Sequence, residues 1–234
     1  MTGNEAASYE ISRAWRTAQA VIRFFCFPFV DFFFKILNRA RAIGADNIPA
    51  HGGVVIASNH VSGIDTLLIP AFATRRRDTM PFMAPAKEEL FRYPVMAQIL
   101  RAWGAFPVKR RARDFDAMRR MAYYAGRYHV MLFPEGTRSK TGELGRGRAG
   151  AGWVIHTARP VVIPTLVINT DKYFWPGRRR PWFGVPYTVV FGEPLDLARF
   201  FAMPESKETS QAIVDEIMAA IVSLKERHKG LYLP

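Results

Sequence analysis

Residues 54–65 read VVIASNHVSGID, and this stretch does most to determine the fold of the chain. Its first part, 54–57, is a short apolar run that follows two glycines, which is typical of a buried strand. A polar turn containing His60 comes next, and the apolar segment 65–73 predicts a helix. A buried strand followed at once by a helix is the repeating unit of an α/β sheet.

The same alternation continues along the chain. Further strands are predicted at 80–84, 105–108, 129–133, 161–168 and 187–191. Further helices are predicted at 88–102 (broken near Pro94), 114–126, 149–158 and 209–228. This order predicts an α/β domain over residues 45–234, with a mixed sheet covered by helices on both faces.

Residues 1–44 form a separate N-terminal segment with a different composition. Within it, residues 16–42 combine seven phenylalanines with several arginines and one lysine, Lys35. This pattern predicts two short amphipathic helices that meet near Pro28 and lie in the surface of an anionic membrane. The alternative is a helical hairpin packed on the protein's own core. The uncharged run 24–30 is far shorter than the roughly 20 residues that span a bilayer, so a simple transmembrane anchor is not expected.

The formal net charge of +13 indicates an anionic partner, which is a nucleic acid, a phospholipid headgroup or a phosphorylated substrate. The single cysteine, Cys26, excludes an intrachain disulfide and fits a reducing compartment. The five histidines are scattered without zinc-ligand spacing, so no metal site is expected. Neither a P-loop nor a G-x-S-x-G elbow is present, which disfavours an NTPase and a serine hydrolase.

Residues 145–150 match the G-x-G-x-x-G spacing of dinucleotide sites. That fingerprint must directly follow a strand, whereas about a dozen residues separate these glycines from strand 129–133. We therefore expect a flexible basic loop near a phosphate site.

Ligands of open α/β sheets collect beyond the carboxyl ends of the strands, where three polar clusters are predicted. The first cluster contains His60, the side chain best suited to take a proton near neutral pH, and Asp65, a carboxylate that could orient it. On one continuous helix they would point about 140° apart, but a turn before the helix lets them face each other. As an alternative, Ser62 and Asp65 resemble a capping box that only begins the helix.

The second cluster is FPEGTRS at 133–139, whose glycine, hydroxyl and guanidinium suit a phosphate. Glu135 would repel a phosphate, so we expect it to orient Arg138 or a substrate hydroxyl. The third cluster comprises Lys109 and Arg110 after strand 105–108, and Lys87 could add a cation at the same edge. The alternatives are an ordinary polar turn for the second cluster and a solvated basic face for the third.

Together these clusters resemble the glycerolipid acyltransferase family, which includes the 1-acyl-sn-glycerol-3-phosphate (lysophosphatidic acid) acyltransferases. The pair His60-x4-Asp65 looks like its first motif, and Gly104-x5-Arg110 is similar to its second. Residues 133–139 match its third motif at every position, and Val162-Ile163-Pro164 looks like its fourth, an apolar strand ending in proline.

The resemblance implies His60 as general base and Asp65 as its orienting partner. It also implies Lys87 as an extra phosphate ligand. The residues that it implies for binding the acceptor are Arg110, Glu135, Gly136, Thr137 and Arg138. The implied reaction moves a fatty acyl group from acyl-CoA or acyl carrier protein to the free hydroxyl of 1-acylglycerol-3-phosphate. It forms phosphatidic acid without a covalent intermediate and requires no cofactor.

Two other acceptors remain open within this class, which are glycerol-3-phosphate and another lysolipid such as a lyso-aminolipid. A basic non-catalytic protein that binds membranes or nucleic acid is the alternative from another class. No known nucleic-acid-binding motif accompanies the positive charge, so nucleic acid is not an expected partner. The expected partners are anionic membrane lipids, a lysophospholipid and an acyl thioester. The expected location is the cytoplasmic face of a membrane, with peripheral or monotopic attachment.

Overall fold

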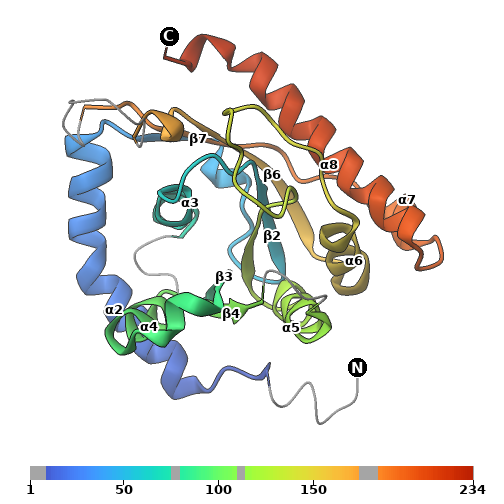
Figure 1. The fold of residues 1–234 in the computed structure, drawn as a ribbon, viewed down its shortest axis with the longest axis horizontal. Helices are drawn as coiled ribbons and strands as arrows, with labels where there is room; N and C mark the ends of the chain where they lie inside the picture. Colours follow the sequence, from blue (N-terminus) through green and yellow to red (C-terminus); the bar gives the residue numbers. More distant parts are fainter. Residues whose placement is uncertain (1–8, 75–79, 110–113, 174–183, 234) are drawn as a thin grey trace.

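The computed structural model describes residues 9–74, 80–109, 114–173 and 184–233. A seven-stranded sheet in the order β1-β7-β6-β2-β5-β3-β4 passes through the molecule (Figure 1). Its strands are β1 Arg41–Ile43, β2 Val54–Ser58, β3 Phe82–Lys87, β4 Ala105–Val108, β5 His129–Leu132, β6 Val161–Ile168 and β7 Thr188–Phe191. Only the β6–β7 pair is antiparallel, which confirms the predicted mixed sheet.

Helices cover both faces of this sheet. They are α2 Arg13–Asp31, α3 Asp65–Ala73, α4 Pro94–Ala102, α5 Phe115–Ala125, α6 Ala149–Ala158, α7 Ala198–Phe201 and α8 Lys207–Arg227. Short π or 3-10 helices are η1 Phe32–Leu37, η2 Ala45–Asn47, η3 Glu88–Arg92, η4 Thr170–Tyr173 and η5 Lys229–Leu231. The core between the sheet and α5, α6 and α8 is separate from the core that holds α3 on the other face (Figure 1).

Strand β2 lies at the centre of the sheet, between β5 and β6. All five of its residues are buried, since Val55 and Ala57 face one core and Val54 and Ile56 face the other. Burial on both faces explains why the sequence shows a continuous apolar run here without polar alternation. The loop that leaves β2 is therefore anchored by the most buried strand of the protein.

Helices α6 and α8 approach each other closely at Gly152. A Cβ atom added to this glycine would lie 1.8 Å from the carbonyl oxygen of Ser210 on α8. No larger residue fits without moving one backbone away from the other, so glycine sets the spacing between the two helices.

The N-terminal segment differs from its prediction at Pro28. Instead of two helices meeting there, α2 continues through Pro28 to Asp31 and passes directly into the π-helix η1. Proline removes one backbone donor from a helix. Here the change in helix type comes four residues later, where the N–H of Phe32 donates to the carbonyls of Phe29 and Pro28.

Strand β1 belongs to the sheet, although residues 41–43 gave no strand signal in the sequence. It pairs in parallel with β7, with Arg41 opposite Thr188. The strand has three residues and no apolar run, so its pairing depends on contacts with a distant segment. The boundary predicted between residues 44 and 45 falls just after β1, so residues 1–44 contribute one strand to the sheet.

Among the residues that the structure describes, no helix combines the length and the apolar composition that a membrane crossing requires.

Candidate functional site

The three polar clusters predicted from the sequence follow neighbouring parallel strands. Strands β2, β5, β3 and β4 lie side by side in this order and end at the same edge of the sheet. His60 follows β2, the segment 133–139 follows β5, Lys87 ends β3 and Lys109 follows β4. A base, a phosphate-suited turn and two cations therefore line one carboxyl edge, where ligands of such sheets bind. Arg110 lies outside the described residues.

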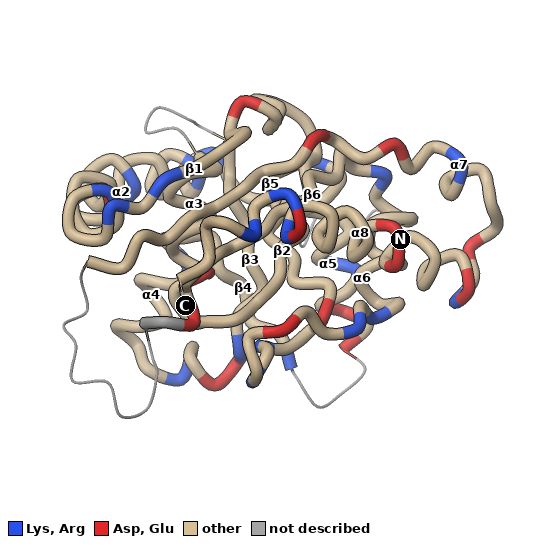
Figure 2. The backbone as a smooth tube through the Cα atoms, turned by 90° about the horizontal axis from the view of Figure 1, so that it is seen from above, with Lys and Arg blue, Asp and Glu red and all other residues tan. Residues whose placement is uncertain are grey.

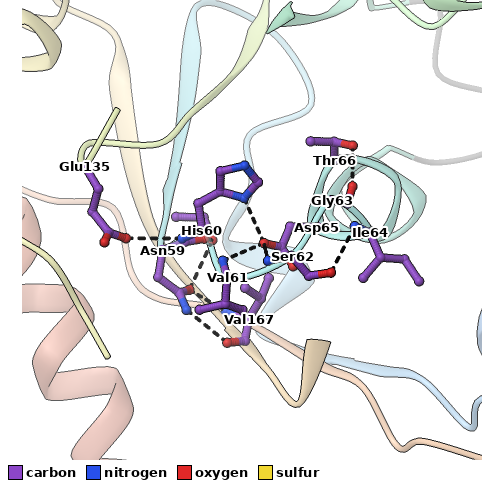
Figure 3. Close-up of polar contacts among 11 residues, drawn as sticks. Asn59, His60, Val61, Ser62, Gly63, Ile64, Asp65, Thr66, Glu135 and Val167 are labelled. Atoms are coloured by element: carbon purple, nitrogen blue, oxygen red, sulfur yellow. Dashed lines mark hydrogen bonds and ion pairs between the residues drawn. The ribbon is translucent and has the colours of Figure 1, made fainter. Parts of the chain in front are cut away.

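The imidazole of His60 and the carboxylate of Asp65 form a hydrogen-bonded pair. Nδ1 of His60 lies 2.9 Å from Oδ2 of Asp65 (Figure 3). His60 occupies the turn and Asp65 is the first residue of α3, which is the arrangement that the spacing requires for the side chains to meet. A carboxylate in this place orients a histidine and stabilises its protonated form.

The same oxygen of Asp65 also holds the turn together. It accepts the backbone N–H groups of Val61 at 2.9 Å and Ser62 at 2.8 Å. Half of the predicted capping box is thus present, while the hydroxyl of Ser62 accepts from the N–H of Ile64 at 3.4 Å and not from that of Asp65. One oxygen of Asp65 thus contacts both the turn and the imidazole, and its role in catalysis stays a prediction.

The ring of His60 is fixed from a second direction by Phe133. The two rings stack with centroids 3.9 Å apart and planes 12° from parallel. The side chain of His60 is 9% exposed and that of Asp65 is fully buried. Within the described part of the chain, Nδ1 of His60 is engaged by Asp65 and no hydrogen bond reaches Nε2. In the tautomer whose Nδ1–H donates to Asp65, Nε2 carries the lone pair and is a hydrogen-bond acceptor.

Asn59 fixes the loop just before His60. Strand β2 ends at Ser58, whereas β6 beside it runs on to Ile168. The side chain of Asn59 accepts the N–H of Val167 at 2.8 Å and donates to its carbonyl at 3.1 Å (Figure 3). A side chain thus replaces the next backbone pairing of the ladder, which rigidifies the turn that carries the base.

Glu135 links the histidine loop to a third segment. Its carboxylate accepts the N–H of His60 at 3.2 Å through one oxygen and the N–H of Gly145 at 2.8 Å through the other. Figure 3 shows Glu135 and Asp65 on opposite sides of His60. Glu135 is 4% exposed. The sequence motif implied a residue that binds the acceptor, and the structure gives this carboxylate two backbone donors.

The loop at 145–150 lies next to the second cluster, as expected, and it is held in place. The N–H of Arg148 donates to the carbonyl of Pro134 at 2.9 Å. Gly147 is buried against α8, where an added Cβ atom would lie 2.0 Å from a methyl carbon of Val214. A side chain at residue 147 would therefore require Val214 or the loop to move, and the contact packs the loop against α8.

The cations at this edge include an arginine with no acidic partner among the described residues. The guanidinium of Arg138 is exposed and lies over the histidine turn, because a Cβ atom added to Gly63 would be 3.8 Å from its Nη1. Gly136, with φ of 69°, shapes the turn before it, and Thr137 is exposed beside it. An unpaired guanidinium close to a base suits a phosphate-bearing substrate.

A cavity lies elsewhere in the fold. A cavity of about 410 Å³ is lined by the residues before β2, the start of β5 and the end of α3, with Asp31 and Lys35 at its wall. These are the amino ends of the strands, opposite the edge that holds His60. Within the described ranges, no three His, Cys, Asp or Glu side chains gather as a metal ion would require.

Sequence reasoning assigned no role to Phe133 or Asn59, although both lie inside the quoted motifs. Their roles depend on which strand lies beside β2, and this is not visible in local spacing. The only available signal was their position at the ends of predicted strands. The fourth motif lies within β6, which continues four residues beyond Pro164, as the predicted strand 161–168 does.

The chain matches a family of known proteins. The family model described as Acyltransferase matches residues 39–168, more than half of the chain, and the chain belongs to this family. The match covers both His60 and the segment 133–139.

Particular relatives are 1-acyl-sn-glycerol-3-phosphate acyltransferases. The chain is 30% identical over 138 residues to one from Borreliella burgdorferi, covering 56% of this chain and 52% of the relative. It is 24% identical over 209 residues to one from Bacillus subtilis, and this match covers 87% of this chain and 96% of the relative. The match thus spans about half the length of the Borreliella relative.

The fold also resembles a solved structure. The crystal structure of the 1-acyl-sn-glycerophosphate acyltransferase PlsC from Thermotoga maritima matches with a TM-score of 0.62 and 21% identity. The match covers 87% of this chain and 81% of that one. It establishes that the two chains share a fold.

Proposed function

We propose that this chain transfers a fatty acyl group from an acyl thioester to the free hydroxyl of 1-acylglycerol-3-phosphate, forming phosphatidic acid. The observation that carries the proposal is the oriented His60–Asp65 pair beneath the unpaired guanidinium of Arg138. The names of the relatives from Borreliella and Bacillus support the choice of acceptor.

His60 acts as general base in the proposed reaction. Nε2 takes the proton of the acceptor hydroxyl while its oxygen attacks the thioester carbonyl carbon. The new C–O bond forms, the C–S bond breaks, and the thiolate leaves with a proton returned by the imidazolium. Asp65 stabilises the imidazolium between the two proton transfers. The acyl group passes directly to the acceptor, so the enzyme needs no nucleophilic serine or cysteine.

The cations hold the acceptor phosphate. Arg138 lies over the turn that contains His60, and Lys87 and Lys109 extend the positive edge along β3 and β4. Fixing the phosphate at one end of the acceptor determines which hydroxyl reaches Nε2. Arg110, Gly136 and Thr137 keep the acceptor-binding roles implied by the family motifs, as predictions.

Helix α2 attaches the enzyme to the membrane surface in this proposal. Its polar residues Gln19 and Arg23 are buried against the protein, whereas Phe25 and Phe29 are 67% and 77% exposed. Phe27 is the apolar residue of α2 that faces the protein, and the exposed phenylalanines suit insertion into the interfacial layer of a bilayer. Basic residues attract the anionic cytoplasmic leaflet, which also fits the reducing compartment indicated by the single cysteine.

The test is an acyl-transfer assay with purified protein and a panel of acceptors. The panel contains 1-acylglycerol-3-phosphate, glycerol-3-phosphate and a lyso-aminolipid, with acyl-CoA or acyl carrier protein as donor. We expect the first acceptor to give the highest kcat/KM. We expect His60→Ala to lower kcat about 10²–10⁴-fold, which is the usual contribution of a general base.

The matched control is His51→Ala, because His51 is exposed in the loop before β2. It should retain the activity and thermal stability of the parent. Full activity of a folded His60→Ala protein would refute the general base. Preference for glycerol-3-phosphate or the lyso-aminolipid would reassign the acceptor and retain the reaction class.

A further inference from the structure

Helix α4 presents its large apolar side chains to the outside of the protein. Val95 is 75% exposed and Ile99 is 49% exposed, while Ala97 is the helix residue that is buried. Met96 at 43% and Tyr93 at 69% extend the same exposed surface. In an ordinary surface helix the apolar stripe faces the core, so α4 is oriented as though its outer side met an apolar phase.

This surface adjoins α2. Nε2 of Gln19 on α2 donates to the carbonyl of Arg101 on α4 at 3.4 Å, and the rings of Phe27 and Trp103 lie 6.5 Å apart. Figures 1 and 2 both show α4 beside α2 on one side of the molecule, and Figure 1 shows α8 on the opposite side. Both neighbouring helices thus expose large apolar side chains, and the buried residues of α2 are Gln19, Arg23 and Phe27.

Basic residues outnumber acidic ones around the two helices, although Glu88 and Glu89 are exposed in η3 just before α4 and Arg23 is buried. Residues 90–105 contain Arg92 and Arg101 and no acidic residue. Helix α2 contains three arginines and Asp31, and the coloured positions on it in Figure 2 are mostly basic. An apolar surface bordered by arginines complements an anionic bilayer, which offers acyl chains beneath negative headgroups.

We propose that Tyr93, at the N-cap of α4, and Val95, Met96 and Ile99 within α4 form a second membrane-inserting surface beside α2. The proposal rests on the proposed function only in placing the enzyme at a bilayer. The rival occupant is a second copy of this chain. A symmetric dimer would bring this surface against itself and bring its bordering arginines together, which repel each other. A bilayer meets the same surface with negative charge.

The first experiment places a polarity-sensitive fluorophore on one cysteine. In a Cys26→Ser chain, the label is attached at Val95→Cys or, as the matched control, at Val222→Cys. Val222 is an apolar residue of α8 that is 45% exposed. Vesicles contain phosphatidylethanolamine with phosphatidylglycerol, and brominated acyl chains serve as quencher.

We expect the label at residue 95 to shift to the blue and to be quenched by brominated chains, while the label at 222 stays in water. A label at 95 that stays in water on vesicle-bound protein would overturn the proposal. Failure of the chain to bind these vesicles would also overturn it. Burial of the label without vesicles, together with a dimer in solution, would assign the surface to a second copy.

The second experiment weakens the surface with the double variant Val95→Ser, Ile99→Ser. In the proposal both aliphatic side chains insert into the bilayer, so their removal should reduce vesicle affinity roughly tenfold or more. The kcat on a short-chain, monomeric acceptor should equal that of the parent, since neither residue follows a strand at the carboxyl edge. Unchanged vesicle affinity would overturn the proposal. An inactive parent would count against the proposed reaction alone, because vesicle binding is measured without substrate.

Discussion

Replacing Glu135 with glutamine tests whether this residue positions the base or contacts the acceptor. Both carboxylate oxygens of Glu135 accept backbone N–H groups, from His60 at 3.2 Å and from Gly145 at 2.8 Å. Glutamine keeps the shape but presents an NH2 group to one of these donors. A buried donor left without an acceptor costs about 1–3 kcal/mol. We therefore expect Glu135→Gln to destabilise the fold by about 2 kcal/mol.

The assay is thermal unfolding followed by circular dichroism, together with steady-state kinetics at varied acceptor concentration. For a chain of this length, about 2 kcal/mol lowers Tm by roughly 4–8 °C. The kcat should fall as well, because the backbone of the base loses a fixed contact, while the acceptor KM should change little. Glu226→Gln is the control, since Glu226 is exposed on α8.

A different result would refute this reasoning. If Glu135→Gln melts like the parent and its main effect is a higher acceptor KM, the carboxylate contacts the acceptor. The role implied by the family motif would then be correct, and the two backbone contacts would contribute little to stability.

Three further predictions concern the base, the phosphate and the C-terminal segment. Asp65→Asn should lower kcat by about 10²–10⁴-fold through loss of imidazole orientation, measured by steady-state kinetics; near-parental kcat would exclude that role. Arg138→Ala should raise the acceptor KM at least tenfold with Tm unchanged, and an unchanged KM would argue against phosphate binding. Burial raises the pKa of Tyr232 from 10.0 to about 12. The stability linked to its protonated form is thus present below pH 10 and lost as the pH rises through 12, and urea unfolding of Tyr232→Phe should show a weaker loss.

Elements with a continuous apolar run could be predicted from the sequence. The predicted strands 105–108 and 161–168 and the predicted helices 65–73 and 149–158 have the observed bounds. Their limits are marked by turn residues or by a change of period, and both signals are local. The facing of His60 and Asp65 was also predictable, because the two residues are five apart and a single turn separates them.

What escaped prediction depends on contacts between distant segments. Strand β1 has three residues and exists through pairing with β7. The contacts of Glu135 require two loops, at 60 and at 145, that only the completed sheet brings together. The phenylalanines of α2 indicated an apolar surface in the sequence. The continuation of this helix through Pro28 could not be predicted in the same way.

The glycine contacts with α8 have a consequence for synthesis of the protein. The loop packs against Val214 at Gly147, and α6 packs against Ser210 at Gly152. The same loop provides the N–H of Gly145, which donates to Glu135. His60 is translated early, whereas α8 is translated long after it. A nascent chain that already contains His60, Asp65 and Arg138 would therefore lack a supported site until α8 leaves the ribosome and docks. Activity would begin only after α8 has packed against this loop and helix.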